Sequence, residues 1–277
     1  MGLRVTTNIA SISAQRSLSA SSREINKSFA QLSSGSRITK AADDAAGLSI
    51  SETLKSQIRG FQQAQRNAND GISMVQVSEG GLGEVSNILT RLRELGVQAA
   101  SDTVGEVERG FIDKEVQQLK NEMQRISQTT RWGNTNLLDG SGSEYSFQVD
   151  INNDEFNDRI AFDAAEQDAT VDTLGVDGFD FTTKDGARDA LSVLEEAQRT
   201  VNGYRANLGA VQNRLISTAE NLGVAVENFS AANSRIRDTD VAQSSAELAR
   251  NNILQQASVG VLAQANMQPA AALKLIG

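Results

Sequence analysis

An apolar residue recurs at every seventh position from Ala187 to Ile236 without a break. This column consists of Ala187, Leu194, Val201, Leu208, Leu215, Leu222, Phe229 and Ile236. Because no proline interrupts it, the repeat predicts one long helix with a narrow apolar seam, which would extend over about 75 Å at 1.5 Å per residue. That length exceeds the diameter of a compact globule of 277 residues. We therefore expect an elongated, mostly α-helical protein.

Two other segments carry apolar stripes of the same period. One extends from a helix cap at Asp43 or Asp44 to about Ala100, and its glycines indicate a bend or close packing. The other fits residues 106–127, and the short connection at 101–105 predicts an antiparallel pair, onto which the 187–236 helix packs as a coiled-coil-like bundle. The predicted bundle seam consists of Leu54, Phe61, Val75, Leu82, Leu89, Leu194, Val201, Leu208, Leu215, Leu222 and Phe229.

Helical periodicity disappears between residues 130 and 186, where glycines and an Asp139-Gly140 pair indicate turns. Residues 145–151 and 159–162 alternate as strands do, which predicts a small β-hairpin that caps the bundle. The expected organisation is an N-terminal core helix at 1–40, the N-terminal part of a bundle domain at 41–129, its β-hairpin and turn region at 130–186, its long C-terminal helix at 187–236, and a C-terminal core helix at 237–277.

The two terminal segments are helical in pattern but poor in charge. A first helix is predicted at 5–33, where Arg4 and Arg16 are the only charged residues before Arg23. A last helix is predicted at 241–268, closed by the only proline, Pro269, and no charged residue occurs from Asn251 to Leu273. The many Asn and Gln side chains make this helix too polar for lipid, whereas its lack of charge makes it a poor solvated surface.

We therefore predict that other protein surrounds the paired terminal helices, which requires many copies of the chain. The alternative is a pair of frayed tails rich in Ser and Gln. The residues predicted to carry self-assembly are Leu18, Ile25, Phe29, Leu32, Ile253, Leu254, Ala257, Val261 and Leu262.

Composition excludes several classes of function. A net charge of -9 and a pI near 4.7 argue against nucleic acid as a partner. Cysteine and histidine are absent, which removes disulfides, the usual zinc sites, thiol nucleophiles and the commonest general base. We expect neither an enzyme nor a cofactor or metal site. The first residues lack the apolar core of a classical signal peptide, and no membrane span is expected.

Several short motifs are distributed along the chain. They are Leu32-Ser-Ser-Gly35 with Arg37-Ile38, Asp43-Asp44-Ala-Ala-Gly47, Arg66-Asn-Ala-Asn-Asp-Gly71-Ile72, Arg91-Leu-Arg-Glu-Leu95, Leu208-Gly-Ala-Val-Gln-Asn-Arg214, Ser234-Arg-Ile-Arg-Asp238, and Asn252-Ile-Leu-Gln-Gln-Ala257 with Leu262-Ala-Gln-Ala-Asn266. These motifs resemble those of bacterial flagellins, the subunits of the flagellar filament, and occur in the family's order. The resemblance covers roughly residues 1–140 and 187–277 and is weak between these segments.

The resemblance implies a minimal flagellin without large outer domains, whose terminal helices line the core of a helical filament used for swimming. It also implies export through the flagellar type III apparatus, an extracellular location, and a cap protein, hook-filament junction proteins and an export chaperone as partners. A hook-filament junction protein is the alternative function, disfavoured because the central motifs match flagellins closely.

The resemblance further implies a patch on the bundle that the vertebrate innate receptor for flagellin recognises. In this sequence the patch would consist of Arg91, Leu95 and, from the next helix, Glu115. The alternative interpretation is an ordinary solvated face with an ion pair between Arg91 and Glu94, three residues apart on one helix.

Overall fold

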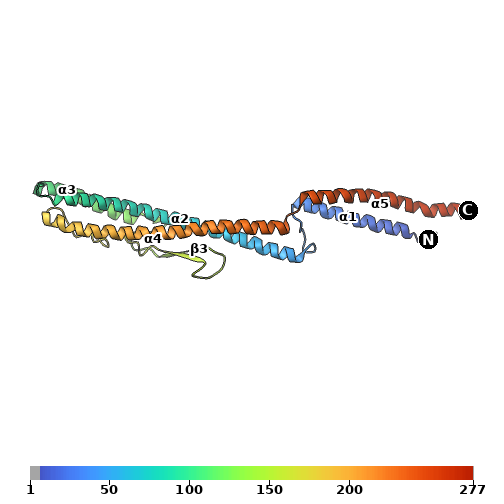
Figure 1. The fold of residues 1–277 in the computed structure, drawn as a ribbon, viewed down its shortest axis with the longest axis horizontal. Coiled ribbons are helices and arrows are strands. Elements are labelled where there is room, and N and C mark those ends of the chain that lie inside the picture. Colours follow the sequence, from blue (N-terminus) through green and yellow to red (C-terminus); the bar gives the residue numbers. More distant parts are fainter. Residues whose placement is uncertain (1–6, 277) are drawn as a thin grey trace. The chain divides into compact units, whose positions relative to one another are not determined.

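The computed structural model describes the backbone of residues 7–276 and the side chains as far as Met267. Most of this part of the chain is helical (Figure 1). The elements are α1 (Ile9–Ser34), α2 (Ala45–Ala99), α3 (Glu106–Thr129), β1 (Arg131–Trp132), β2 (Thr135–Asn136), β3 (Glu144–Gln148), β4 (Arg159–Asp163), α4 (Lys184–Arg237) and α5 (Val241–Ile276). They form two compact units, residues 57–227 and the remainder, and each is described by itself.

The first unit is a helical bundle of α2, α3 and α4. Helices α2 and α4 are antiparallel, because the Nε2 atom of Gln65 donates to the carbonyl of Ala219 (3.2 Å) while Nε2 of Gln198 donates to Oγ of Ser86 (2.7 Å). Its core contains most of the predicted seam together with further apolar side chains, and the largest of them are fully buried. They include Met74, Leu82, Leu89, Leu92, Met123, Leu194, Leu208 and Leu215.

The start of α2 is capped by Asp44, whose Oδ1 atom accepts a hydrogen bond from the backbone N–H of Gly47 (2.8 Å). Of the two candidate caps, Asp44 is therefore the one used. Asp43 instead closes the preceding turn, where it accepts hydrogen bonds from the hydroxyl and N–H of Thr39 and from the N–H of Lys40. These bonds, that from the Thr39 side chain first, lower the pKa of Asp43.

A β-hairpin packs beside α2. Strands β3 and β4 are antiparallel, with Phe147 opposite Ile160. The prediction of two strands here is confirmed, although the first ends at Gln148 rather than at residue 151, because the Gln148 side chain donates to the carbonyls of Asp150 and Asn152 and closes a loop. Gly71 of α2 allows the hairpin to approach this helix, since a β-carbon at Gly71 would lie 3.1 Å from the Phe147 ring.

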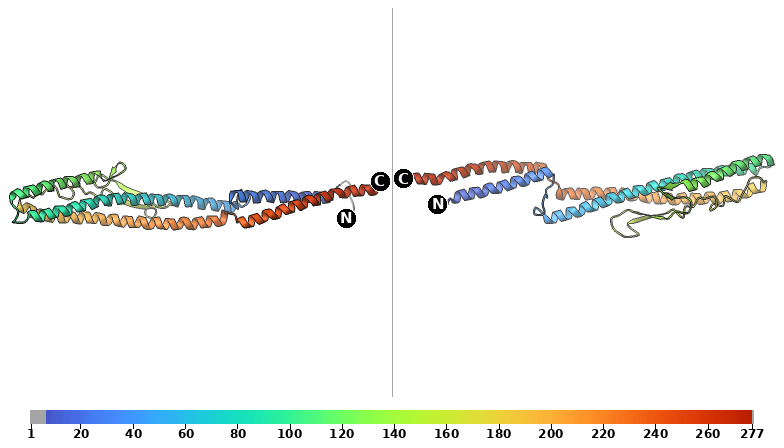
Figure 2. Two further views of the ribbon diagram at one scale, coloured as in Figure 1. Left: turned by 90° about the horizontal axis from the view of Figure 1, so that it is seen from above. Right: turned by 180° about the vertical axis from the view of Figure 1, so that it is seen from behind.

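The second unit contains α1 and α5, which lie side by side (Figures 1 and 2). At one end a single antiparallel β-bridge joins Ser36 and Asp238, and the N–H of Thr239 donates to the carbonyl of Gly35 (3.0 Å). Gly35 ends α1 in the left-handed conformation, with φ of 69°, which a glycine adopts without strain.

The prediction that Pro269 ends the last helix is wrong. Helix α5 continues past Pro269 to Ile276. Proline removes one backbone donor and crowds the preceding turn, and this costs stability but does not by itself stop a helix whose other hydrogen bonds are made. At the other end of the chain, α1 begins at Ile9, and residues 5 and 6 of the predicted first helix lie outside the described residues.

Candidate assembly surface

Most of the predicted bundle seam lies in the core. Val75, Leu82, Leu89, Leu194, Val201, Leu208, Leu215 and Leu222 are buried. The remaining three residues, Leu54, Phe61 and Phe229, are half-buried. Helix α3 does not cover them. Thr130, directly after the end of α3, lies beside Gly81 of α2, so α3 packs only on the part of the bundle beyond that level.

The predicted self-assembly residues fall into two groups. Leu18, Ile25, Leu32 and Leu262 are half-buried, as expected for side chains near the contact between α1 and α5. Phe29, Ile253, Leu254, Ala257 and Val261 are exposed. The exposure is large, 66% for Phe29 and Ile253 and 59% for Val261. The first group is thus partly covered within the helix pair, and the second group lies at its surface.

Several further apolar side chains on the two helices are exposed and were not singled out from the sequence. They are Ile9, Ile12, Val241, Val259 and Met267. A single stripe at helical spacing does not include them, because they add apolar positions on other faces of the same helices. The available signal was the uncharged stretch after Arg250, in which apolar, small and amide residues are mixed and no charged face is present.

Polar side chains on this helix pair contact each other. The Oγ atom of Ser11 donates to Oδ1 of Asn266 (2.8 Å), and Nε2 of Gln255 donates to Oγ of Ser22 (3.2 Å).

The exposed apolar side chains of α1 and α5 represent unused free energy of burial. Fully burying one large apolar side chain is worth about 1.5–3 kcal/mol. A surface with this many of them favours contact with more protein. None of the helices in the described part of the chain is long and apolar enough to cross a membrane.

On the bundle, Arg91 and Glu115 form an exposed ion pair between α2 and α3. Nη2 and Nε of Arg91 donate to Oε1 of Glu115 (2.8 and 3.0 Å), and Nη1 donates to Oε2 of Glu94 (3.0 Å). These bonds, that to Glu115 first, raise the pKa of Arg91. The structure therefore brings two of the three predicted patch residues together.

Leu95 is not part of that surface. It is only 2% exposed and belongs to the hydrophobic core. The reason is that α2 contacts both α3 and α4 here, so that Ile88 and Leu95 form an additional buried column beside Leu92 and Ala99. Of the three residues that the resemblance assigned to the patch, Arg91 and Glu115 are therefore exposed and Leu95 is buried.

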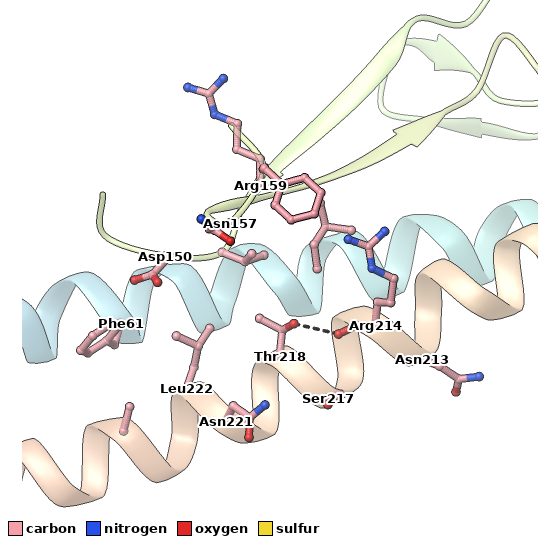
Figure 3. Close-up of a pocket in the computed structure, with 14 residues that line it drawn as sticks. Phe61, Asp150, Asn157, Arg159, Asn213, Arg214, Ser217, Thr218, Asn221 and Leu222 are labelled. Atoms are coloured by element: carbon pink, nitrogen blue, oxygen red, sulfur yellow. Dashed lines mark hydrogen bonds between the residues drawn. The ribbon is translucent and has the colours of Figure 1, made fainter. Parts of the chain in front are cut away.

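A hollow of about 640 Å³ lies between the hairpin and the helices α2 and α4 (Figure 3). Its walls include Phe61, Asp150, Arg159, Arg214 and Thr218. Figure 3 shows the guanidinium group of Arg159 extending away from α4, while that of Arg214 extends toward the hairpin. A catalytic site requires polar side chains that converge on one point, and the polar side chains labelled in Figure 3 do not converge.

Comparisons with known proteins agree with the helical architecture. A family model described as the bacterial flagellin N-terminal helical region matches residues 5–143, and one described as the bacterial flagellin C-terminal helical region matches residues 191–276. Together they leave residues 1–4, 144–190 and 277 unmatched, a set that includes the β3–β4 hairpin and the first residues of α4.

Individual proteins are similar over nearly the whole chain. A flagellin of Halalkalibacterium halodurans is 42% identical over 97% of this chain and 98% of its own. The flagellar filament core protein flaB2 of Brachyspira hyodysenteriae is 39% identical over 98% of this chain and 99% of its own. The crystal structure of Bacillus cereus flagellin is similar with a TM-score of 0.51 and 28% identity, covering 57% of this chain and 88% of that one.

Proposed function

This chain belongs to the bacterial flagellin family and is a structural subunit of the flagellar filament, and we propose that α1 and α5 are the surface through which its copies polymerise. The observation that carries the proposal is the exposure of large apolar side chains on these two helices, with Phe29 and Ile253 as the clearest cases. Neighbouring copies that cover these side chains would gain the free energy of their burial.

The lack of charge supports the same proposal. An ionised group buried among subunits without a partner would cost several kcal/mol. Helix α5 carries none from Asn251 to Leu273, whereas its amide side chains can exchange hydrogen bonds with other helices. A surface of this composition can be enclosed by protein on every side. The role is mechanical, and we propose that the chain has no enzymatic activity.

A substitution on α5 tests the proposal without disturbing the bundle. Ile253→Asp places a carboxylate on an exposed position, so the melting temperature of the bundle is expected to remain unchanged while seeded polymerisation, followed by light scattering, is abolished. Ile253→Leu, which conserves volume and polarity, should polymerise like the parent chain. If Ile253→Asp elongates seeds at the parent rate, Ile253 is not in the assembly surface.

Filament length separates the two structural roles that the sequence left open. A filament subunit adds to its own polymer without limit, whereas a hook-filament junction protein would stop after a short segment. Electron microscopy of the purified chain under polymerising conditions should therefore show long tubes. Short rings or capped stubs alone would favour the junction protein.

We further propose secretion through the flagellar export apparatus, assembly under a cap protein, contact with junction proteins and binding of an export chaperone. These partners follow from family membership. Recognition by the vertebrate innate receptor is proposed for the surface at Arg91 and Glu115, which form one exposed cluster across two helices.

A further inference from the structure

Helix α5 contains a proline at a position where a backbone donor is needed. In an α-helix the N–H of residue i donates to the carbonyl of residue i−4, so the partner of Ala265 would be the N–H of residue 269. Residue 269 is proline and has no N–H. Ala265 is a buried residue, and the hydrogen bond that its carbonyl accepts is partly buried. A buried carbonyl without a donor destabilises the structure that contains it.

The missing donor comes from α1. The Nδ2 atom of Asn8 donates to the carbonyl oxygen of Ala265 at 2.7 Å. The Oδ1 atom of the same side chain accepts from the N–H of Ser11 at 3.0 Å, which makes Asn8 the N-cap of α1. One amide group therefore begins α1 and completes α5 at the same time.

We propose that Asn8 is the positioning residue that sets the register of α1 against α5 for assembly, by supplying the donor that Pro269 withholds from Ala265. The β-bridge between Ser36 and Asp238 closes the helix pair at one end, and Asn8 fixes the other end. A shift of α1 by one helical turn, about 5.4 Å, would carry the Asn8 amide away from the Ala265 carbonyl. The contacts of Ser11 with Asn266 and of Gln255 with Ser22 belong to this same register, and the carbonyl of Ala265 adds a requirement for a donor that a shifted α1 would not meet.

The inference rests on the proposed function, because the helix pair in this register is the surface that neighbouring copies would cover. It makes Asn8 and Pro269 a matched pair. The donor at Asn8 is needed because residue 269 is proline, so a residue with an N–H at 269 should make the donor dispensable.

Three variants test this pairing. Asn8→Asp keeps the oxygen that caps α1 and suits the positive end of the helix dipole, but it removes the amide donor and directs an oxygen at the Ala265 carbonyl. Its critical concentration for seeded polymerisation should rise about tenfold, which corresponds to about 1.4 kcal/mol. Pro269→Ala restores the backbone donor, so it should polymerise at least as well as the parent, and Asn8→Asp/Pro269→Ala should recover the parent value. Asn121→Asp makes the same change of charge at an exposed position of α3, outside the proposed assembly surface, and should have no effect.

A second readout reports register without polymerisation. The chain contains no cysteine, so Ser11→Cys/Asn266→Cys introduces the only thiols, at two side chains that contact each other. Disulfide formation in this background should be several-fold slower with Asn8→Asp and restored by adding Pro269→Ala. If the parent chain never polymerises, the proposed function fails, while the disulfide result still decides the register. If Asn8→Asp leaves both readouts unchanged, or if Pro269→Ala does not rescue it, the pairing of Asn8 with Pro269 is refuted.

Discussion

The Nε atom of Arg109, on α3, donates a hydrogen bond to the carbonyl of Ala99, the last residue of α2, at 2.8 Å. Its Nη2 atom donates to the carbonyl of Ser101 at 2.9 Å. The last carbonyls of a helix have no partner within the helix, and a positive charge there also interacts favourably with the helix dipole. One nearly buried guanidinium group therefore ends α2 and holds the turn into α3.

Arg109→Ala should lower the free energy of unfolding by about 1–3 kcal/mol, because the buried carbonyl of Ala99 loses its donor. Urea denaturation followed by circular dichroism measures the change. Arg125→Ala is the matched control, since Arg125 lies on the same helix but forms an exposed ion pair with Glu122, and it should change stability little. Equal stability of the two variants would show that the contact at Ala99 contributes nothing.

Leu215→Asp should destabilise the bundle by about 4 kcal/mol or more, because it buries a carboxylate without a partner in the fully buried seam of α4. Ala206→Asp, on an exposed position of the same helix, should cost less than about 1 kcal/mol. Thermal melts of the two variants give the comparison. A melting temperature for Leu215→Asp near that of Ala206→Asp would contradict the placement of Leu215 in the core.

The seam around Leu215 was predictable because its information is local. A seven-residue period specifies which side of a helix is apolar, and that side is buried regardless of which element packs against it. The cap at Asp44 was predictable to within one residue for a similar reason. The choice between the two carboxylates depends on the turn before the helix. The N–H groups of Thr39 and Lys40 donate hydrogen bonds to Asp43, which leaves Asp44 as the cap.

Pro269 and Leu95 could not be interpreted correctly from local pattern. The cost of proline inside α5 depends on a donor from Asn8, which is distant in sequence. The burial of Leu95 depends on α3 and α4 meeting α2 at the same level, which widens the apolar stripe beyond two columns. In both cases the deciding contact is tertiary, and family motifs carry no information about which way a side chain points.

A buried lysine gives the bundle a pH dependence. Lys120 is 4% exposed, and its Nζ atom donates to the carbonyls of Asp177 (3.1 Å) and Phe179 (2.5 Å) and lies 4.1 Å from the centre of the Phe179 ring. Burial lowers the pKa of Lys120, although Asp177, Asp113 and Asp180 act in the opposite direction.

The direction in which stability changes with pH follows from the number of protons bound by the folded and the unfolded chain. In the window between the lowered folded-state pKa of Lys120 and the unfolded value of about 10.4, the unfolded chain binds more protons. The stability that Lys120 contributes is therefore fully present above the unfolded pKa and is lost as the pH falls through the lowered one. The difference in unfolding free energy between the parent and Lys120→Met should consequently increase with pH across this window.

Urea denaturation at a series of alkaline pH values measures that difference. Lys114→Met removes the same charge from an exposed position of α3 and provides the matched control. The difference between the parent and Lys114→Met should stay nearly constant. A parent-minus-Lys120→Met difference that is flat or falls with pH would contradict the assignment of burial as the dominant influence on the pKa of Lys120.

The two residues of α2 in the proposed receptor patch are expected to act differently: Arg91 through direct contact, and Leu95 through the stability of the fold. Arg91→Ala removes an exposed ion pair with Glu115, so the melting temperature should change little while activation of a receptor reporter by monomer falls severalfold. Leu95→Ala truncates a core side chain and should cost about 2–5 kcal/mol. Any loss of signal in Leu95→Ala should therefore disappear when the assay is run at a temperature where that variant is fully folded.

Glu115→Gln is the control for charge at this surface, because it keeps the shape of the side chain but weakens its bond to Arg91. It should reduce the reporter signal less than Arg91→Ala and leave the fold intact. A parent monomer that gives no signal, or an Arg91→Ala variant that signals at the parent level, would remove Arg91 from receptor recognition. A folded Leu95→Ala variant that remains silent would show that Leu95 influences the surface by shaping α2 rather than through stability alone.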